Sequence, residues 1–334
     1  MLGAKQLRMA GTFLRYRFRE IHVFEVQALL TTSCNLRCRY CRCPSLNTPE
    51  MTTEQWVGLI RHFAGLGTQR IKFQGGEPTL RKDFGALCRA AREAGITAAV
   101  VTNGLRIAAE PELLDDLDEV VVSIDSVTPG FHDDLRGRGS HARAVRAVEL
   151  ARARGMATYV NMVVSTDTLG EVPAMLEFCE ARGVRLNPQP IAFGREAFDR
   201  DAARLALSNE QNRVLHRQLV RWKREGRALM FSPAAYQVAV DWPDNAELTR
   251  RCAGESDCMA GRFYVHVEAN GDVWPCSMHG ADFVAKNLLG DGVEAALRQA
   301  RHHNCADCFY AYLCERKLLF RLNPAALLEL LRRS

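Results

Sequence analysis

Three cysteines stand close together near the start of the chain. Cys34, Cys38 and Cys41 are spaced C-x3-C-x2-C within the stretch CNLRCRYC. Grouped thiolates select iron–sulfur clusters, zinc or copper. Structural zinc usually has four protein ligands, and the next histidine, His62, falls inside a predicted helix. A [4Fe–4S] cluster on three thiolates leaves one iron open to an outside ligand, so the spacing favours a catalytic cluster, with Cys43 as a bystander.

The remaining cysteines are of two kinds. Cys88 and Cys179 stand alone in apolar helical settings, and we interpret them as core thiols because free cysteine is commonly buried. No apolar run reaches the roughly 18 residues of a membrane span, and the start does not read as a signal peptide. We therefore expect the chain in the reducing cytosol, where clustered cysteines indicate metal or catalysis. The late clustered cysteines are Cys252, Cys258, Cys276, Cys305, Cys308 and Cys314.

The elements that must position these cysteines alternate between strand and helix patterns. Strands are predicted at residues 22–31, 70–74, 97–102, 119–125, 157–165 and 185–191. Helices are predicted at residues 51–67, 83–95, 111–117, 141–155 and 171–183. Such short strand–helix units allow only parallel crossovers, and six units are fewer than the eight of a closed barrel. The predicted fold class is α/β, a partial (βα)6 barrel whose first cysteine loop follows its first strand.

Composition divides the rest of the chain. The net charge is +5, which is too mild to indicate nucleic acid as a partner. An amphipathic helix is predicted at 209–226, and residues 232–247 look turn-rich and extended. The predicted domains are an N-terminal basic segment at 1–21, the barrel at 22–192, a connecting region at 193–250 and a small Cys-rich domain with a C-terminal helix at 251–334.

Several motifs accompany the first cysteine group. GGEP directly follows the second predicted strand, TNG follows the third, VVVSIDS forms the fourth, and DDLRGRG comes shortly after it. With an aromatic residue, Tyr40, just before the last cysteine, this set resembles the radical S-adenosylmethionine (SAM) enzymes. The residues that the resemblance assigns to SAM binding are Gly75, Gly76, Glu77, Pro78, Asn103, Ser123, Asp125 and Arg136.

The resemblance implies a role for each motif. GGEP would hold the methionyl amine of SAM, because two glycines allow close backbone approach and the glutamate can offset an ammonium charge. The serine and aspartate of the fourth strand would reach the ribose, the arginine would approach the SAM carboxylate, and TNG would shape the pocket. SAM itself would fill the open iron position. In the family, one electron from the cluster cleaves SAM, and the 5′-deoxyadenosyl radical abstracts a hydrogen atom from the substrate.

The late cysteines resemble the SPASM/twitch extension, which carries auxiliary iron–sulfur clusters in many radical SAM enzymes. The likeness rests on GDVWPC and on C-x2-C-x5-C, over about residues 252–318, and it departs at Leu318, where a full SPASM would have another cysteine. We favour one auxiliary [4Fe–4S] cluster, held by Cys258, Cys276, Cys305 and Cys308. Two clusters stay open, with three thiolates each: Cys252, Cys258 and Cys276, and then Cys305, Cys308 and Cys314.

A zinc ribbon built from the same late cysteines is the alternative to an auxiliary cluster. The spare ligands that keep it open are His266, His279, His302 and His303. A non-catalytic iron–sulfur or zinc protein is the corresponding alternative for the whole chain. GGEP and the serine–aspartate pair of the fourth strand argue against it, because neither is needed without SAM.

The reaction is expected to begin at an unactivated C–H bond. We predict dehydrogenation or epimerisation of a small or carbohydrate-like substrate, and slightly favour dehydrogenation because a late cluster can accept an electron. In sulfatase-maturing relatives an acid follows the PC of GDVWPC, but here that position is Ser277. Peptide maturation is the alternative, with a separate recognition partner, since about 20 residues are too few for a leader-binding domain. Flavodoxin or ferredoxin is the expected electron donor.

Both ends of the chain mix basic and apolar residues. Residues 1–21 interleave arginine with leucine and phenylalanine, and residues 326–334 read ALLELLRRS. This pattern predicts either peripheral contact with a membrane surface or, as we favour, helices packed on the barrel with a solvated face.

Overall fold

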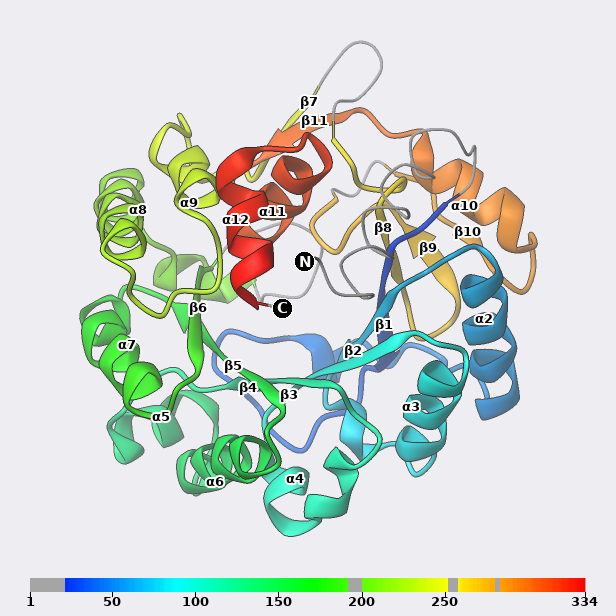
Figure 1. Ribbon diagram of the computed structural model, residues 1–334, viewed down its shortest axis with the longest axis horizontal. Coiled ribbons are helices and arrows are strands. Elements are labelled where there is room, and N and C mark those ends of the chain that lie inside the picture. Colours follow the sequence, from blue (N-terminus) through cyan, green and yellow to red (C-terminus); the bar gives the residue numbers. More distant parts are fainter. Residues whose placement is uncertain (1–21, 192–199, 252–257, 280–282, 334) are drawn as a thin grey trace.

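The computed structural model describes residues 22–191, 200–251, 258–279 and 283–333. Six parallel strands pair in sequence order, each with the next along the chain. Helices cover the outside of this curved sheet (Figure 1). The predicted partial (βα)6 barrel is therefore confirmed. The strands are β1 (Glu25–Thr31), β2 (Arg70–Gly75), β3 (Thr97–Thr102), β4 (Glu119–Ser123), β5 (Ala157–Val164) and β6 (Arg185–Pro190).

The helices around the barrel follow the predicted apolar periodicity. The first begins at a capping box in which Thr52 and Gln55 bond each other's backbone. Cys88 and Cys179 are fully buried on the second and sixth, which confirms them as core thiols. The helices are α2 (Thr53–Gly65), α3 (Phe84–Glu93), α4 (Leu105–Ala109), α5 (Pro129–Arg136), α6 (Ser140–Ala153), α7 (Val172–Ala181), α8 (Asn209–Arg224) and α9 (Pro233–Val240).

One local prediction was wrong, and another was met only in part. The stretch 232–247 contains α9, because the Ser232 side chain accepts a hydrogen bond from the Ala235 N–H and Pro233 stands at the first helical position. Residues 111–117 form only a short 3-10 helix, η3 (Pro111–Leu114). The other 3-10 helices are η1 (Cys43–Ser45), η2 (Pro78–Leu80), η4 (Leu169–Glu171) and η5 (Arg200–Leu205).

The late part of the chain shares the barrel's sheet. β8 pairs in parallel with β1, and β9 and β10 continue that edge, so the sheet has nine strands. Two further strands, β7 and β11, pair separately. These elements are β7 (Thr249–Arg251), β8 (Tyr264–Val267), β9 (Asp272–Trp274), β10 (Lys286–Asn287), α10 (Val293–Arg301), β11 (Cys305–Cys308), α11 (Ala311–Phe320) and α12 (Pro324–Arg333).

A buried charge network ties α11 to the amino ends of the barrel strands. Glu25 on β1 is fully buried and pairs with Arg70 on β2 at 2.8 Å and with Arg316 on α11 at 2.9 Å. Lys72 lies 3.7 Å above the ring of Tyr312, also on α11. Burial alone would raise the pKa of Glu25, but Arg316, Arg70 and Lys72 together lower it to about 2. Buried charged side chains thus hold α11 to the barrel.

The C-terminal helix packs through a buried acid. Glu329 on α12 bonds Arg185 at 2.6 Å and Lys223 at 2.9 Å. The basic segment at 1–21 lies outside the described residues, so membrane contact stays a prediction. Within the described ranges, no helix is long and apolar enough to cross a membrane.

Candidate active site

The first cysteine group lies on the loop that leaves the carboxyl end of β1. Cys34, Cys38 and Cys41 are all partly exposed. The Cys41 N–H donates to the Cys38 carbonyl at 3.0 Å, and the Leu36 N–H donates to the Cys34 sulfur at 3.4 Å. Burial raises the pKa of the Cys38 thiol to about 11. Three accessible thiols on one short loop, with an amide already directed at a sulfur, fit a thiolate-held iron–sulfur cluster.

The GGEP turn packs directly against this loop. The Gly76 N–H donates to the Thr31 carbonyl and the Glu77 N–H donates to the Ser33 carbonyl, both at 2.8 Å. A Cβ on Gly75 would collide with the Thr31 carbonyl oxygen, and one on Gly76 with the Ser33 carbonyl oxygen. The predicted close backbone approach is present, and its partner here is the strand end that carries the cysteines.

Glu77 is bonded to protein rather than facing open space. It is almost completely buried and accepts hydrogen bonds from the Thr79 and Thr102 hydroxyls at 2.6 and 2.8 Å and from the Asn103 N–H at 2.7 Å. Burial raises the pKa of Glu77, while these donors oppose the rise. The carboxylate therefore ties GGEP to TNG at the ends of neighbouring strands. Its predicted contact with the SAM ammonium stays a prediction.

Asn103 connects the third strand to the cysteine loop. Its side-chain N–H donates to Asn35 at 2.8 Å, and its Oδ1 accepts from the Leu105 N–H at 3.0 Å. The same Nδ2 lies 4.0 Å from the Cys34 sulfur. TNG thus helps to shape the loop that carries the first cysteine.

Asp125 and Arg136 meet under the loop, together with a residue whose role the sequence reasoning missed. Asp125 accepts from Arg136 Nε at 2.6 Å and from the Tyr40 hydroxyl at 2.6 Å, and the Val163 N–H donates to its other oxygen at 2.9 Å. All three side chains are buried. Ser123, at the end of β4, is also buried. The predicted contacts with ribose and carboxylate stay predictions, and the signal for Tyr40 was its place before the last cysteine.

The late cysteines form a second, enclosed group. Cys258 and Cys276 flank the β8–β9 hairpin, and Cys305 and Cys308 are the end residues of β11. A side-chain hydrogen bond from Cys305 is the main cause that lowers the pKa of Cys258 to about 7, and the Tyr264 hydroxyl also bonds Cys258. Electrostatic interactions join Cys276 to Cys258 and Cys308. These four buried thiols have the ligand chemistry of one cubane cluster.

The other predicted late ligands have different surroundings. Cys314 donates to the Cys308 carbonyl at 3.0 Å, from α11. Cys252 lies outside the described residues. His266 bonds Gln74 and Glu268, and His303 bonds the Ala260 carbonyl. Across the described ranges, no three His, Cys, Asp or Glu side chains are gathered closely enough to hold a single metal ion; a four-iron cluster is larger than one ion.

Comparison with known sequences gives one family. The sequence model of the Radical SAM superfamily matches residues 29–179. The mycofactocin maturase MftC of Mycobacterium ulcerans is 29% identical over 275 residues, which cover 79% of this chain and 71% of that protein. The PqqA peptide cyclase of Gluconobacter oxydans is 30% identical over 272 residues, which cover 77% of this chain and 70% of that protein.

Solved structures share the fold. Streptococcus suis SuiB bound to S-adenosylmethionine matches with a TM-score of 0.62 at 17% identity, over 89% of this chain and 73% of that one. The protein anSMEcpe with bound AdoMet and the Cp18Cys peptide matches with a TM-score of 0.63 at 16% identity, over 92% of this chain and 99% of that one. At such identities the likeness concerns the fold alone.

Proposed function

Because this chain belongs to the radical SAM superfamily, we propose that it modifies a peptide by radical chemistry at an unactivated C–H bond. It is an enzyme that uses a [4Fe–4S] cluster and SAM. The observation that carries the peptide assignment is the pair of relatives named as a peptide cyclase and a maturase, each aligned over more than three quarters of this chain. They support the peptide alternative over the small or carbohydrate-like substrate that the sequence reasoning placed first.

The first cysteine group and its support would bind the cofactors. Cys34, Cys38 and Cys41 would hold the catalytic cluster, which with SAM supplies reductive cleavage and hydrogen-atom abstraction when bound. Glu77 would fix the GGEP turn through Thr102 and Asn103. The Tyr40–Asp125–Arg136 network would hold the loop over the strand ends. Flavodoxin or ferredoxin remains the proposed electron donor.

The late group would hold one auxiliary cluster. Cys258, Cys276, Cys305 and Cys308 supply four thiols, so such a cluster would have a full set of protein ligands. Their burial supports this assignment. A role in accepting an electron from the substrate radical follows for an oxidative reaction, as in the dehydrogenation favoured from the sequence.

Deuterium transfer tests the peptide assignment. The enzyme is reconstituted anaerobically and given SAM, a reductant and deuterated synthetic peptides encoded by short reading frames beside its gene. A deuterated sugar panel is run in parallel. We expect deuterium in 5′-deoxyadenosine with at least one peptide and with no sugar, measured by mass spectrometry. Deuterium transferred from a sugar, and from none of the peptides, would instead support the small or carbohydrate-like substrate that the sequence reasoning placed first.

A further inference from the structure

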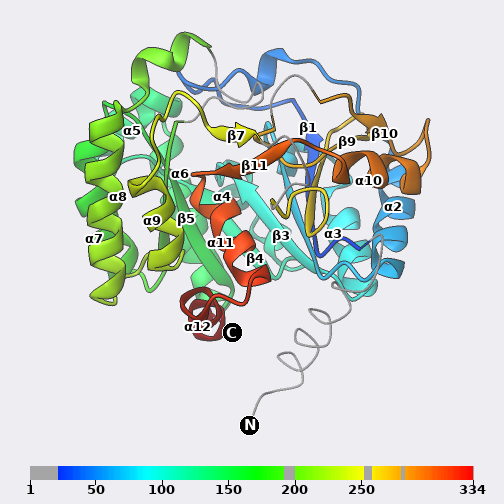
Figure 2. The same ribbon diagram turned by 90° about the horizontal axis from the view of Figure 1, so that it is seen from above.

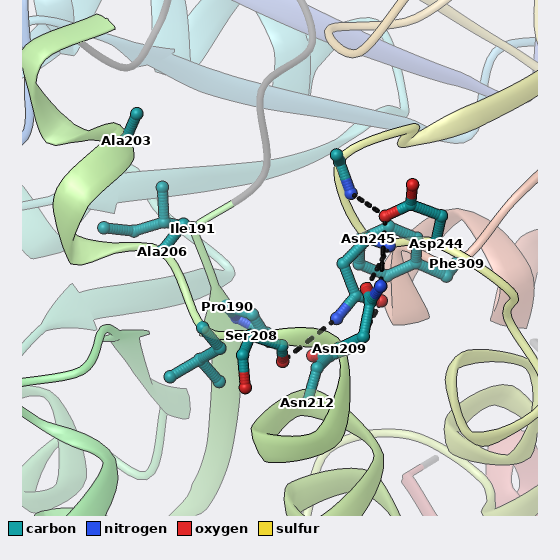
Figure 3. Close-up of a pocket in the computed structure, with 12 residues that line it drawn as sticks. Pro190, Ile191, Ala203, Ala206, Ser208, Asn209, Asn212, Asp244, Asn245 and Phe309 are labelled. Carbon is teal, nitrogen blue, oxygen red and sulfur yellow. Dashed lines mark hydrogen bonds between the residues drawn. The ribbon is translucent and has the colours of Figure 1, made fainter.

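A cavity of about 390 Å³ lies between the end of β6 and the start of α8. Figure 3 shows Ile191 and Ala206 on one side of it and Asn245 and Asp244 on the other. Its volume is within the range of small-ligand sites. One wall is therefore apolar and the facing wall is built from carboxamides and a carboxylate.

Two of the residues that line the cavity connect it to the cysteine groups. Ile191 belongs to the apolar cluster around Tyr40, and Cys38, Cys41 and Ala206 pack against that cluster. On the opposite wall, Phe309 directly follows Cys308 in the chain and lines the cavity. A molecule bound here would touch Ile191, which packs with Tyr40 of the catalytic loop, and Phe309, which is the chain neighbour of Cys308.

The carboxamides are held in a chain of hydrogen bonds. Asn212 Nδ2 donates to Asn245 Oδ1 at 2.9 Å, the Asn245 N–H donates to Asn209 Oδ1 at 2.7 Å, and Asn209 Nδ2 donates to Asp244 at 3.2 Å (Figure 3). Each side chain thus has a fixed orientation. This chain of bonds preorganises the polar wall before any ligand arrives.

One acceptor in this wall has no donor. Asn212 is 1% exposed, lines the cavity, and its Oδ1 has no hydrogen-bond partner. A buried acceptor without a donor costs about 1–3 kcal/mol, so such an atom calls for an explanation, and one explanation is a further group that binds beside it. The missing group must be a hydrogen-bond donor.

The lining also selects the charge of the ligand. Among the described residues that line the cavity there is no Lys, Arg or His. A phosphate or carboxylate would find no counter-charge among these described residues, and Asp244 at the rim would repel it. A neutral group with an N–H donor and an apolar side chain matches both walls.

We propose that this cavity, the amide pocket, binds one residue of the substrate peptide, whose backbone N–H donates to Asn212 Oδ1 while its apolar side chain packs on Ile191 and Phe309. This inference rests on the proposed function, since it names the part of the peptide that the site would recognise. The position between the two cysteine groups would then place a neighbouring residue of the peptide near the catalytic loop.

Binding of small probes tests the pocket without turnover. The probes are N-acetyl-leucine N-methylamide, N-acetyl-leucine methyl ester, which lacks the C-terminal N–H, and 2-acetoxy-4-methylpentanoic acid N-methylamide, in which an ester oxygen replaces the leucine N–H. Affinities are measured by ligand-observed NMR on the cluster-loaded enzyme. For the wild type, we expect one of the two ester replacements to weaken binding at least tenfold. With Asn212→Leu, the diamide should also bind at least tenfold more weakly, and the esters should no longer differ from it.

Two controls keep the result interpretable. Val214→Ala changes an exposed position on the same helix and should leave all affinities unchanged. Ala206→Leu narrows the cavity without changing the carboxamides, so it should weaken the binding of all probes. This variant replaces Asn212→Leu as the test if Asn212→Leu does not fold. Equal affinity of the diamide for wild type and Asn212→Leu, or for wild type and Ala206→Leu, would overturn the proposal. Peptide turnover is measured separately in the deuterium assay. A failure of the amide pocket can therefore be told apart from a failure of the proposed peptide modification.

Discussion

The two cysteine groups differ in how far the protein encloses them. Cys34, Cys38 and Cys41 are partly exposed on a loop at the carboxyl ends of the strands. Cys258, Cys276, Cys305 and Cys308 are all buried, with exposed fractions of 5–7%. Figure 2 shows the loop after β1 and the β7–β11 sheet toward the same side of the molecule, away from α12. The difference indicates one site that can take an outside ligand and one that is closed by its own thiols.

Their surroundings differ in the same sense. The loop of the first group is held by polar side chains from several strand ends, such as Glu77 and Asp125. The late group sits between short strands and bonds within itself, as Cys258 does with Cys305. A rigid polar frame suits a site that must bind and release SAM, whereas self-contained burial suits a permanent cluster.

Removing each group should have different effects on SAM cleavage. Changing Cys34, Cys38 and Cys41 together to Ala should reduce 5′-deoxyadenosine formation to background and remove about four irons. Changing the late four to Ala should also remove about four irons, yet leave SAM cleavage without substrate measurable. Iron analysis and mass spectrometry of 5′-deoxyadenosine check both. Continued SAM cleavage in the first variant would break the comparison.

The next largest effect concerns the attachment of the late region to the barrel. Glu25→Gln removes the acid that pairs with buried Arg316, while Arg70 keeps its ion pair with Glu119, so we expect a loss of about 3–5 kcal/mol in the free energy of unfolding. Glu294→Gln removes an exposed pair on α10 and should cost under about 0.5 kcal/mol. Denaturant unfolding under anaerobic conditions measures both. Similar small losses would mean that α11 is not fixed through this network.

One phenol beside each group allows a matched test. Tyr40→Phe removes a hydrogen bond to buried Asp125, and we expect SAM affinity to fall about tenfold, or about 1.4 kcal/mol, with iron retained. Tyr264→Phe removes the hydroxyl beside Cys258 and should lower the late cluster's reduction potential by tens of millivolts without changing SAM affinity. Calorimetric titration and redox titration separate the two. A loss of SAM affinity in Tyr264→Phe would contradict the assignment.

A smaller effect, on the pH dependence of stability, is expected from Lys72 beneath α11. Burial, and then the charges of Arg70 and Arg316, lower its pKa to about 7 despite Glu25. Between pH 7 and pH 10, the unfolded chain keeps a proton on Lys72 that the folded chain has lost, so stability should rise with pH. We expect a rise of about 1 kcal/mol per pH unit relative to Lys72→Met. Denaturant unfolding of the wild type and of Lys72→Met at pH 7, 8 and 9 measures this rise. The same pH dependence of stability in both proteins would contradict the prediction.

Sequence periodicity predicted the barrel because its signals are local. The Thr52–Gln55 capping box and the buried strand patterns lie within a few residues. The pairing of β8 with β1 was not predictable in this way, since it joins residues more than 200 positions apart and β8 is only four residues long. The helix α9 was missed because its short apolar run offered no clear period.

The site was predictable in its residue types and less so in its contacts. Cysteine spacing and GGEP pointed to the cofactors, since the chemistry of thiolates and tight turns resides in short motifs. The hydrogen bonds of Glu77 to Thr102 and Asn103, and of Tyr40 to Asp125, cross between strands and depend on the barrel. The amide pocket likewise joins Asn212 to Asn245 across 33 positions, which no motif signals.

Electron paramagnetic resonance tests the central contrast most directly. Each cluster is reduced and observed alone: the first in the variant that lacks Cys258, Cys276, Cys305 and Cys308, and the second in the variant that lacks the first three cysteines. SAM is then added to each. An open iron in the first group predicts that SAM changes its spectrum, while the enclosed second cluster should keep its spectrum unchanged. A spectrum that changes only in the late group, or in neither, would contradict the account.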